Sequence, residues 1–537
     1  MSVNTLPGSH VLGIGDIKVA RQAITSLMAL GFVALLTLAY TRIAGTAPIN
    51  SDHASILLEA DDVLHGNILL HGWILTAITF YTTDLPFYVI GIALRGFSPA
   101  LLREVPAVIY ALTVTAAIAL AGRGVCPERR TLARLTAFTL IGLPSLLVPQ
   151  IVLVGVNHVG TALFMLLTLL ALDRPRRRAL FGLLLALTIF GDSMAVVLML
   201  LPIVLVSAAR LLKDRTRWSK ERTVLIPVMA AFLVSRIAIV VFRLADGFKS
   251  GDPAMKLTYL ETLPRNTVVT IKSLLELFRA NPFGKEVGLE TAGLLAGLLG
   301  LGFVVYSLRL GIGHWQRWEI GGDRITEILT VAMVLNLLAY LLDYNVVYYM
   351  NTLYSPPERY LVPFFVFSAV LAGRLGVARV PELPRFKLGL AALAVAYTGF
   401  FVQQLLTPPL DMSEAKLGRW LLARGLTYGY GSYWCSNIIT GVTDGQVKVR
   451  ALSASSDAHL GQMYWFSKGE WYRTTPAHFL VFAPSHYQGK TFYWKGVNLA
   501  AARRTFGPPD ETAQFGEDTV LIWKKDITPA LTFGGAK

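Results

Sequence analysis

A group of four acidic residues stands directly after the first apolar run that is long enough to cross a membrane. The stretch NSDHASILLEADDVLHGN, residues 50–67, contains Asp52, Glu59, Asp61 and Asp62. A carboxylate can accept the proton of an attacking hydroxyl group, so each of these side chains is a candidate general base. Glu59, Asp61 and Asp62 have a simpler explanation as the solvated, polar side of a surface helix. The question is therefore which acid does chemistry.

Other residues suited to catalysis or phosphate binding lie in short polar turns between apolar runs. A histidine can hydrogen-bond a phosphate or ligate a metal, and a guanidinium group can hold a phosphate. Helix capping is the simpler explanation of Asp192 and an equal alternative for Asp84. Exposure near lipid headgroups is the simpler explanation of Arg265, whereas Arg359, beside Glu358 at the mouth of a predicted helix, favours a site. The candidates of this group are His53, Asp84, Asn157, His158, Asp192, Arg265, Glu358 and Arg359.

The composition indicates that lipid surrounds much of the chain. Of the 537 residues, 54% are hydrophobic and only 15% are charged, and the mean hydropathy is +0.54. A soluble chain of this length needs more polar residues to cover its surface. The formal net charge of +15 comes largely from basic clusters between apolar runs, as in cytoplasmic loops, so no nucleic-acid partner is needed to explain it. The clusters are residues 173–178, 213–222, 309–324 and 379–387.

The span-length rule predicts about eleven membrane crossings. A further apolar piece, residues 84–97, is predicted to lie along the outer face as a juxtamembrane helix, because another crossing would move the later basic clusters outside. The N-terminus is then inside and the C-terminus outside, with loops 43–100 and 244–288 on the outer face. The predicted crossings are residues 22–42, 101–121, 132–153, 157–172, 179–190, 193–211, 223–243, 289–309, 325–342, 359–377 and 386–405.

The last part of the chain changes from helix-length to strand-length apolar runs, which are residues 445–452, 477–484, 490–494 and 518–525. Residues 1–405 are therefore predicted to form a transmembrane module, and residues 406–537 a soluble α/β domain outside the membrane. Cys126 and Cys435 fall on opposite sides, so we expect no disulfide between them. The tryptophans of this domain can stack on sugar faces or lie in its core, and the core is the simpler explanation for any one of them. They are Trp434, Trp465, Trp471, Trp494 and Trp523.

Four segments follow one another in an order that one enzyme superfamily shares. After the first predicted helix comes APINSDHASILLEADDVLHGNILLHGW, then FYTTDLPFY, LLREVPAVIYAL and, late in the chain, ERYLVPFFVF. Together with a soluble C-terminal domain, they resemble the GT-C superfamily of integral membrane glycosyltransferases, of the protein mannosyltransferase and aminoarabinose transferase type. The resemblance implies a mainly α fold: a polytopic helix bundle in the cell (inner) membrane, with a C-terminal extracytoplasmic α/β domain.

The resemblance also implies an activity. It is the transfer of a sugar from a polyprenyl-phosphate donor to a lipid, glycan or protein acceptor of the cell envelope, on the outer side of the membrane. Asp52 would be the catalytic general base, and His158, Arg265 and Arg359 would hold the donor phosphate. Relatives often have a second acid directly after the first, and this chain has His53 there. This departure argues against a paired-carboxylate metal site, and a divalent metal is left as a possible cofactor without assigned ligands. Further possible members of the site are His53, Asp84, Asn157, Asp192 and Glu358.

Two other classes of function also fit the predicted helices. One is a transporter, a flippase-like protein or a structural envelope protein. Against it, the predicted spans lack charged residues deep inside, where a translocation path usually needs polar groups. The other is an enzyme of the O-antigen ligase or polymerase type, which would use a pyrophosphate-linked donor and a large basic outer loop. This alternative stays open because loop 244–288 carries Lys249, Lys256, Arg265, Lys272 and Arg279.

Overall fold

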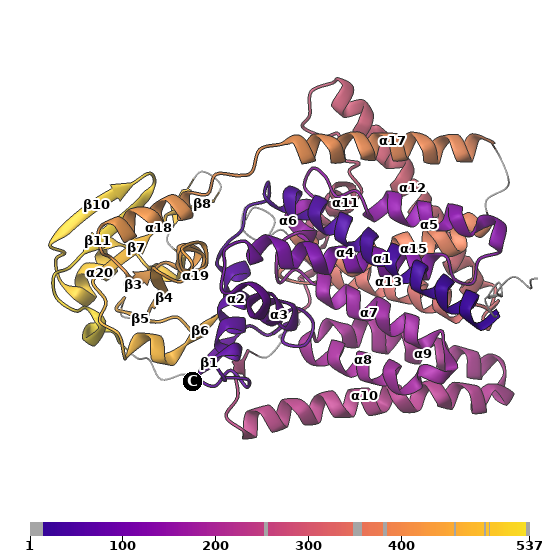
Figure 1. Ribbon diagram of the computed structural model, residues 1–537, viewed down its shortest axis with the longest axis horizontal. Coiled ribbons are helices and arrows are strands. Elements are labelled where there is room, and N and C mark those ends of the chain that lie inside the picture. Colours follow the sequence, from indigo (N-terminus) through magenta and orange to yellow (C-terminus); the bar gives the residue numbers. More distant parts are fainter. Residues whose placement is uncertain are drawn as a thin grey trace, which may run out of the picture.

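The computed structural model describes residues 14–251, 256–346, 357–379, 384–455, 458–487, 490–492 and 494–532. A bundle of long helices forms one part of the molecule, and a C-terminal part that contains a six-stranded sheet lies against one end of it (Figure 1). Helices α2 (Ser51–Leu64) and α3 (Leu85–Arg95) and strand β1 (Trp73–Leu75) lie between the two parts. The predicted outer loop 43–100 is therefore a folded connector.

The bundle contains most of the predicted crossings as helices. Its helices are α1 (Ile14–Ala44), α4 (Leu101–Ala121), α5 (Pro127–Ile141), α6 (Pro149–Val152), α7 (Val159–Leu172), α8 (Arg178–Gly191), α9 (Leu201–Lys213), α10 (Trp218–Leu244), α11 (Leu263–Leu277), α12 (Leu289–Gln316), α13 (Arg324–Leu342), α15 (Val362–Leu371), α16 (Val377–Arg379) and α17 (Pro384–Leu406). Short helical turns in this part are η1 (Pro175–Arg177), η2 (Val196–Leu200), η3 (Arg215–Arg217), η4 (Leu260–Thr262), η5 (Pro357–Leu361) and η6 (Ala372–Gly376).

Eight helical segments in the described part of the chain are long and apolar enough to cross a membrane. Three other predicted crossings are shorter, since α5 has 15 residues and α7 and α8 have 14 each. The predicted crossing 132–153 is interrupted: α5 ends at Ile141, and Pro144 follows before the short helix α6. A residue before proline disfavours helical backbone, which explains the break.

Burial follows the apolar pattern of each helix. Helix α15, VPFFVFSAVL, has no charged residue, and all ten of its residues are buried. Only 17% of the apolar window of α17 is buried inside the protein, and α10 reaches 22%. A helix that is apolar on every side suits a protein interior or a lipid environment. We therefore read α15 as the centre of the bundle and α10 and α17, on its opposite edges in Figure 1, as lipid-facing.

The basic turns between the helices meet at one end of the bundle. Arg123 pairs with Asp173 at 3.5 Å, Arg374 with Asp323 at 2.8 Å, and the buried Arg210 with Glu327 at 2.6 Å. Arg374 also donates to the carbonyl of Leu120 at the end of α4. Helix α4 begins beside the C-terminal part, because Arg103 in its first turn donates to Ala47 and contacts Met412. The basic turns and the C-terminal part therefore lie at opposite ends of α4. Part of the basic cluster 379–387 lies outside the described residues.

The C-terminal part is built on a mixed sheet of order β10-β11-β7-β3-β4-β5, in which β3 runs parallel to both of its neighbours. Four predicted strand-length runs, 445–452, 477–484, 490–494 and 518–525, each contain a strand. The helices are α18 (Ser413–Ala423), α19 (Tyr433–Val442) and α20 (Leu499–Phe506), with turns η7 (Gly469–Tyr472), η8 (Trp494–Gly496) and η9 (Thr528–Ala530). The strands are β3 (Tyr428–Gly431), β4 (Lys448–Ala454), β5 (Leu460–Gln462), β6 (Ser467–Lys468), β7 (Phe479–Phe482), β8 (Ser485–Tyr487), β9 (Lys490–Phe492), β10 (Glu511–Phe515) and β11 (Asp518–Ile522). Cys435 is buried and Cys126 exposed, and both are free thiols.

Two contacts join the C-terminal part to the connector. Helix α19 packs on α2, where the buried Asn437 donates its side-chain amide to Ser55 Oγ at 2.9 Å and to the carbonyl of Phe466 at 3.0 Å. Strand β1 pairs with β6 of the C-terminal part and with β2 (Lys249–Ser250) of loop 244–288. A three-stranded sheet thus ties together segments far apart in the sequence. Because buried amide groups need partners, these hydrogen bonds fix the register of α19 on α2.

The expectation that Glu59, Asp61 and Asp62 all lie on the solvated side of a helix is wrong for Glu59. Its side chain is 1% exposed, and among the described residues its Oε1 has no hydrogen-bond partner. Asp62 is also engaged, since it accepts hydrogen bonds from Trp73 Nε1 at 2.7 Å and from Asn67. The reason is the packing of α19 and α3 on α2, which covers faces of the helix that the sequence alone leaves open.

The buried Glu59 generates a prediction about stability. Burial raises the pKa of Glu59 well above its usual value. The folded state therefore binds a proton that the unfolded state releases above about pH 4.3, and stability decreases as the pH rises beyond that value. We expect Glu59→Gln to raise the unfolding temperature in detergent at pH 8 and to give a smaller gain at pH 5. The exposed Glu261→Gln serves as the control. A lower unfolding temperature for Glu59→Gln at pH 8 contradicts this account.

Candidate active site

A small cavity at the end of the bundle nearest the C-terminal part is lined by three of the candidate site residues predicted from the sequence. Its volume is about 140 Å³. Asp52 comes from the first turn of α2, His158 precedes α7, and Arg359 lies in η5. The structure thus brings together side chains from three distant segments. The remaining lining residues are Thr76, Ala77, Ile78, Phe80, Val156, Tyr360, Trp465 and Phe466.

Asp52 is held between the connector and the C-terminal part. Its Oδ1 accepts a hydrogen bond from the hydroxyl of Tyr433, the first residue of α19. Burial raises the pKa of Asp52 above its usual value, while the charge of Arg359 and hydrogen bonds from Tyr433 and Trp465 lower it and offset part of the effect. A general base works best when its pKa lies near the operating pH, so a raised pKa suits a carboxylate in that role.

His53 has a structural explanation. Asn50 caps α2 by accepting hydrogen bonds from the backbone N–H groups of Asp52 and His53, and His53 Nδ1 accepts the backbone N–H of Asn50 at 3.0 Å. This is a reciprocal capping arrangement, with histidine where glutamate is usual. Burial and then the charges of Arg359 and Arg103 lower the pKa of His53 to about 3. His53 is therefore neutral, as an acceptor nitrogen requires.

His158 is oriented by Asp192. The backbone of His158 is left-handed, with φ of +62°, and only 2% of its side chain is exposed. Its Nδ1 lies 2.7 Å from Asp192 Oδ2, which also accepts from Thr161 Oγ1 at 2.7 Å. Burial acts to raise the pKa of Asp192, but His158 and the hydrogen bonds outweigh it and hold the pKa below its usual value. The ionised carboxylate accepts from Nδ1–H of His158, so Nε2 is the ring nitrogen left for the cavity.

Asp192 also does what capping predicted, since its Oδ1 accepts the backbone N–H of Met194 at 2.9 Å. Asp192 therefore caps the following helical turn and also holds His158 in the site, the two roles that the sequence left as alternatives. Asp84 makes no capping hydrogen bond to α3. Its Oδ2 accepts from Thr83 Oγ1 at 2.8 Å instead, and a Cβ atom at Gly160 would lie only 2.3 Å from that oxygen. Glycine is thus required where Asp84 packs against the start of α7.

Asp84 and Asn157 do not line the cavity but support the turn that carries His158. Asn157 is 2% exposed and donates its side-chain amide to the carbonyl of Ile151 at 3.1 Å. Burial raises the pKa of Asp84 to about 7, and the charge of Asp192 acts in the same direction. Both residues thus support the backbone between α6 and α7 without lining the cavity.

Arg359 faces the cavity beside aromatic rings. Its Nη2 donates to the hydroxyl of Tyr360 at 3.1 Å, and its guanidinium carbon lies 5.0 Å from the centre of that ring. The Tyr360 ring in turn lies 5.3 Å from the His158 ring. The neighbouring Glu358 turns away from the cavity, where it is buried and accepts a hydrogen bond from Ser273 Oγ at 3.1 Å. A guanidinium and an imidazole thus line the cavity with one carboxylate.

Arg265 does not line this cavity. It is exposed near the start of α11, as expected for a basic residue outside a site. Among the described residues, no group of three or more histidine, cysteine, aspartate or glutamate side chains is suited to hold a metal ion. Of these four residue types, the cavity lining contains one carboxylate, Asp52, and one imidazole, His158. A divalent metal cofactor therefore stays a prediction.

The sequence did not identify Tyr433 as a neighbour of Asp52. The two residues are 381 positions apart and belong to different parts of the molecule. Trp465, also from the C-terminal part, was noted as a tryptophan that can stack on a sugar or lie in the core, and it lines the cavity with 41% of its surface exposed. The contacts depend on how α19 docks on α2, which no local pattern in the sequence encodes.

Comparisons with known proteins identify the fold. No protein-family model matches the chain, and no curated protein matches its sequence. Two crystal structures of ArnT from Cupriavidus metallidurans are similar. The structure bound to undecaprenyl phosphate has a TM-score of 0.53 at 12% identity and covers 92% of this chain and 97% of ArnT. The apo structure has a TM-score of 0.54 at 12% identity and covers 95% and 100%.

A weaker similarity, with a TM-score of 0.48 at 13% identity, relates 84% of this chain to 69% of an oligosaccharyltransferase from Archaeoglobus fulgidus in the apo form. The ArnT similarity spans nearly the whole of both chains. It confirms the fold that the sequence implied, a bundle of long apolar helices followed by a strand-containing C-terminal domain, and this fold is similar to that of ArnT.

The Asp192 network generates a second prediction about stability. Asp192→Asn keeps the shape but removes the charge that His158 and Thr161 hydrogen-bond, so we expect a loss of about 1–3 kcal/mol at pH 7. The folded-state pKa of Asp192 is lowered, so this stability is present above the unfolded pKa of about 3.9 and is lost as the pH falls below it. Thermal unfolding in detergent should show equal losses at pH 7 and pH 5.5. Asp173→Asn, at an exposed turn, is the control, and an unfolding temperature equal to wild type for Asp192→Asn would refute the network.

Proposed function

We propose that this protein is a membrane glycosyltransferase that moves a sugar from a polyprenyl-phosphate donor to an acceptor of the cell envelope. The observation that carries the proposal is the cavity that Asp52, His158 and Arg359 line together. One carboxylate for proton transfer and two groups suited to a phosphate are what such a reaction needs. The fold similarity to ArnT, crystallised with undecaprenyl phosphate, supports the choice of donor.

The reaction is a displacement at the anomeric carbon of the donor sugar. Asp52 takes the proton from the acceptor hydroxyl as its oxygen forms the new glycosidic bond. The bond from the sugar to the phosphate oxygen breaks, and polyprenyl phosphate leaves with that electron pair. Arg359 and His158 stabilise the negative charge that develops on the leaving phosphate. A single displacement of this kind inverts the configuration at the sugar and is the simplest course.

Asp192 leaves Nε2 of His158 as the ring nitrogen that contacts the donor. When the ring is protonated, Nε2–H donates to an oxygen of the leaving phosphate, and the buried Asp192 carboxylate balances the charge of the ring. Arg359 supplies the positive charge. The cavity, about 140 Å³, is below the about 300 Å³ of typical small-molecule sites, so it takes the reacting end of the donor while the rest of the lipid lies outside it.

We also propose that the reaction takes place on the outer side of the membrane, with the C-terminal domain there and the N-terminus inside. The ion pairs of the basic turns, which include Arg123–Asp173 and Arg210–Glu327, gather at the end of the bundle away from Asp52. Basic loops favour the cytoplasmic side. By that rule the basic turns lie on the cytoplasmic side, and the cavity, at the other end of the bundle, lies on the outer side.

Asp52→Asn tests the proposed function. Membranes that contain the protein receive polyprenyl-phosphate donors carrying different sugars, and mass spectrometry measures the lipid phosphate released. We expect release by the wild type and a loss of about 10²-fold or more in Asp52→Asn at equal abundance, because the base is removed. Asp173→Asn should keep full activity. Undiminished release by Asp52→Asn refutes the assignment. In a parallel assay with sugars linked to polyprenyl pyrophosphate, release of polyprenyl pyrophosphate would identify a pyrophosphate-linked donor.

The hydrogen bond from Tyr433 gives a prediction about pH dependence. This bond lowers the pKa of Asp52, so Tyr433→Phe should raise that pKa further. The base is active when ionised, and the rate falls as the pH drops through its pKa. The acidic limb of the pH–rate profile should therefore move to higher pH in Tyr433→Phe, with little change in the rate at the alkaline plateau. Tyr306→Phe, a change on the lipid side of α12, should leave the profile where it is. A shift of the limb to lower pH contradicts the predicted link.

A further inference from the structure

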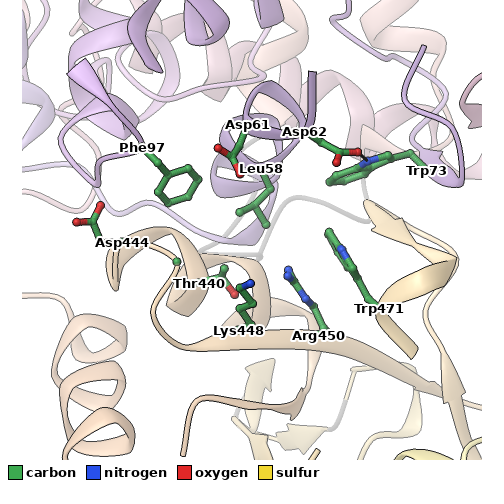
Figure 2. Close-up of a pocket in the computed structure, with 11 residues that line it drawn as sticks. Leu58, Asp61, Asp62, Trp73, Phe97, Thr440, Asp444, Lys448, Arg450 and Trp471 are labelled. Carbon is green, nitrogen blue, oxygen red and sulfur yellow. Dashed lines mark hydrogen bonds between the residues drawn. The ribbon is translucent and has the colours of Figure 1, made fainter. Parts of the chain in front are cut away.

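A second and larger cavity lies at the other end of α2. Its volume is about 390 Å³, within the range of about 300–1,000 Å³ that is typical of small-molecule sites. Asp61, which lines it, follows Asp52 by nine residues of helix, or about 14 Å, so this is a separate cavity from the one described above. It opens between the connector and the C-terminal domain (Figure 2).

The walls of this cavity combine aromatic rings with charges of both signs. Trp73 and Trp471 form one side, with ring centres 4.9 Å apart, and Phe97 lies across from them (Figure 2). The acids come from the end of α2 and from the turn after α19, and the bases come from β4. They are Asp61, Asp62, Asp444, Lys448 and Arg450.

Arg450 is the feature that calls for an explanation. It is 6% exposed, and its guanidinium carbon lies 3.7 Å from the centre of the Trp471 ring. Among the described residues, its Nε and Nη1 have no hydrogen-bond partner. Burial lowers its pKa, and the groups that offset this effect are two uncharged phenols: Tyr428, which hydrogen-bonds the guanidinium, and Tyr472. A buried guanidinium without an anion is costly, so an arrangement of this kind calls for an anionic partner.

The nearby acids do not supply this partner. Asp62 already accepts hydrogen bonds from Trp73 and Asn67 and pairs with Lys468 at 3.2 Å. Asp61 lies 3.6 Å from His65. Asp444 is exposed at the mouth of the cavity, on the side away from the tryptophans in Figure 2. The site therefore offers one deep cation, with carboxylates around its opening.

The charges that line this cavity limit which classes of ligand can bind in it. A polyanion such as a nucleotide is repelled by the three acids, and a purely cationic ligand is repelled by Arg450. A neutral ligand leaves Arg450 unpaired. One negative charge together with several hydroxyl donors satisfies both sets of groups, because carboxylates accept hydroxyl hydrogens and a guanidinium binds an oxyanion with two N–H groups. Aromatic rings provide flat apolar surfaces for the C–H faces of a sugar.

We propose that this cavity binds a saccharide unit that carries one carboxylate or phosphate group. The anionic group lies at the Arg450 guanidinium, the sugar ring packs against the aromatic side chains, and its hydroxyl groups donate to Asp61 and Asp444. Binding at this cavity does not depend on the activity proposed for the Asp52 cavity.

Binding to the full-length protein in nanodiscs tests the proposal. The probes are methyl β-glucuronide and glucose 1-phosphate, with methyl β-glucoside as the neutral counterpart, and calorimetry measures their affinities. We expect either acidic probe to bind about tenfold or more tightly than the glucoside, since hydrogen bonds to a buried charge distinguish them. A preference for the glucuronide identifies a carboxylate ligand, and a preference for glucose 1-phosphate a phosphate ligand.

Variants at Arg450 locate the binding. Arg450→Met keeps a long apolar side chain against Trp471 and should remove the preference for the acidic probe. Arg450→Lys keeps the charge but not the planar guanidinium, so the affinity for the acidic probe should fall several-fold. This variant tests the proposal even if the methionine variant does not fold. The exposed Arg503→Met is the matched control. Equal affinities for acidic and neutral probes, binding of phosphoethanolamine but of neither acidic sugar, or unchanged affinity in both Arg450 variants would overturn the proposal.

Discussion

The packing of α19 on α2 is the constraint on which both cavities depend. The first turn of α2 presents Asp52 to Tyr433 of α19, and the middle of the helix holds Asn437 through Ser55. The last turn presents Asp61 and Asp62 to the second cavity. A shift of one residue in this contact would separate Asp52 from the Tyr433 hydroxyl and would leave the buried amide of Asn437 without its partner. The hydrogen bonds of this interface therefore set the geometry of the connector as well as its attachment.

Two aspartates near the first cavity illustrate how environment separates carboxylates of the same type. Asp52 accepts hydrogen bonds from Tyr433 and Trp465, but burial outweighs them and raises its pKa. Asp192 is fully buried, but His158, Thr161 and the backbone of Met194 hold its pKa below the usual value. The first arrangement suits a group that takes a proton, and the second suits a group that stays ionised and orients a histidine. The pKa shifts of the two carboxylates thus agree with the proposed role of Asp52 as the base and of Asp192 as the group that orients His158.

The sequence predicted the fold class, the helical segments and the change to a strand-containing domain, because apolar run length and turn residues are local properties. It also selected Asp52, His158 and Arg359, which share one cavity, although their chemical roles stay predictions. Arg265 and Glu358 were selected for their place in an outer loop and at a helix mouth, and both lie outside that cavity. Tyr433 was missed, and Glu59 was expected in solvent, because both positions depend on contact between residues hundreds of positions apart. Local pattern carries no information about which face of α2 the C-terminal domain covers.

The central claim is that the Asp52 cavity receives the phosphate of a polyprenyl lipid. Cryo-electron microscopy of the protein in nanodiscs loaded with polyprenyl phosphate measures this directly. The account predicts density for the phosphate within hydrogen-bond distance of the Arg359 guanidinium and next to His158, with the isoprenoid chain running outward between helices. Phosphate density at another site, with an empty cavity at Asp52, would contradict it.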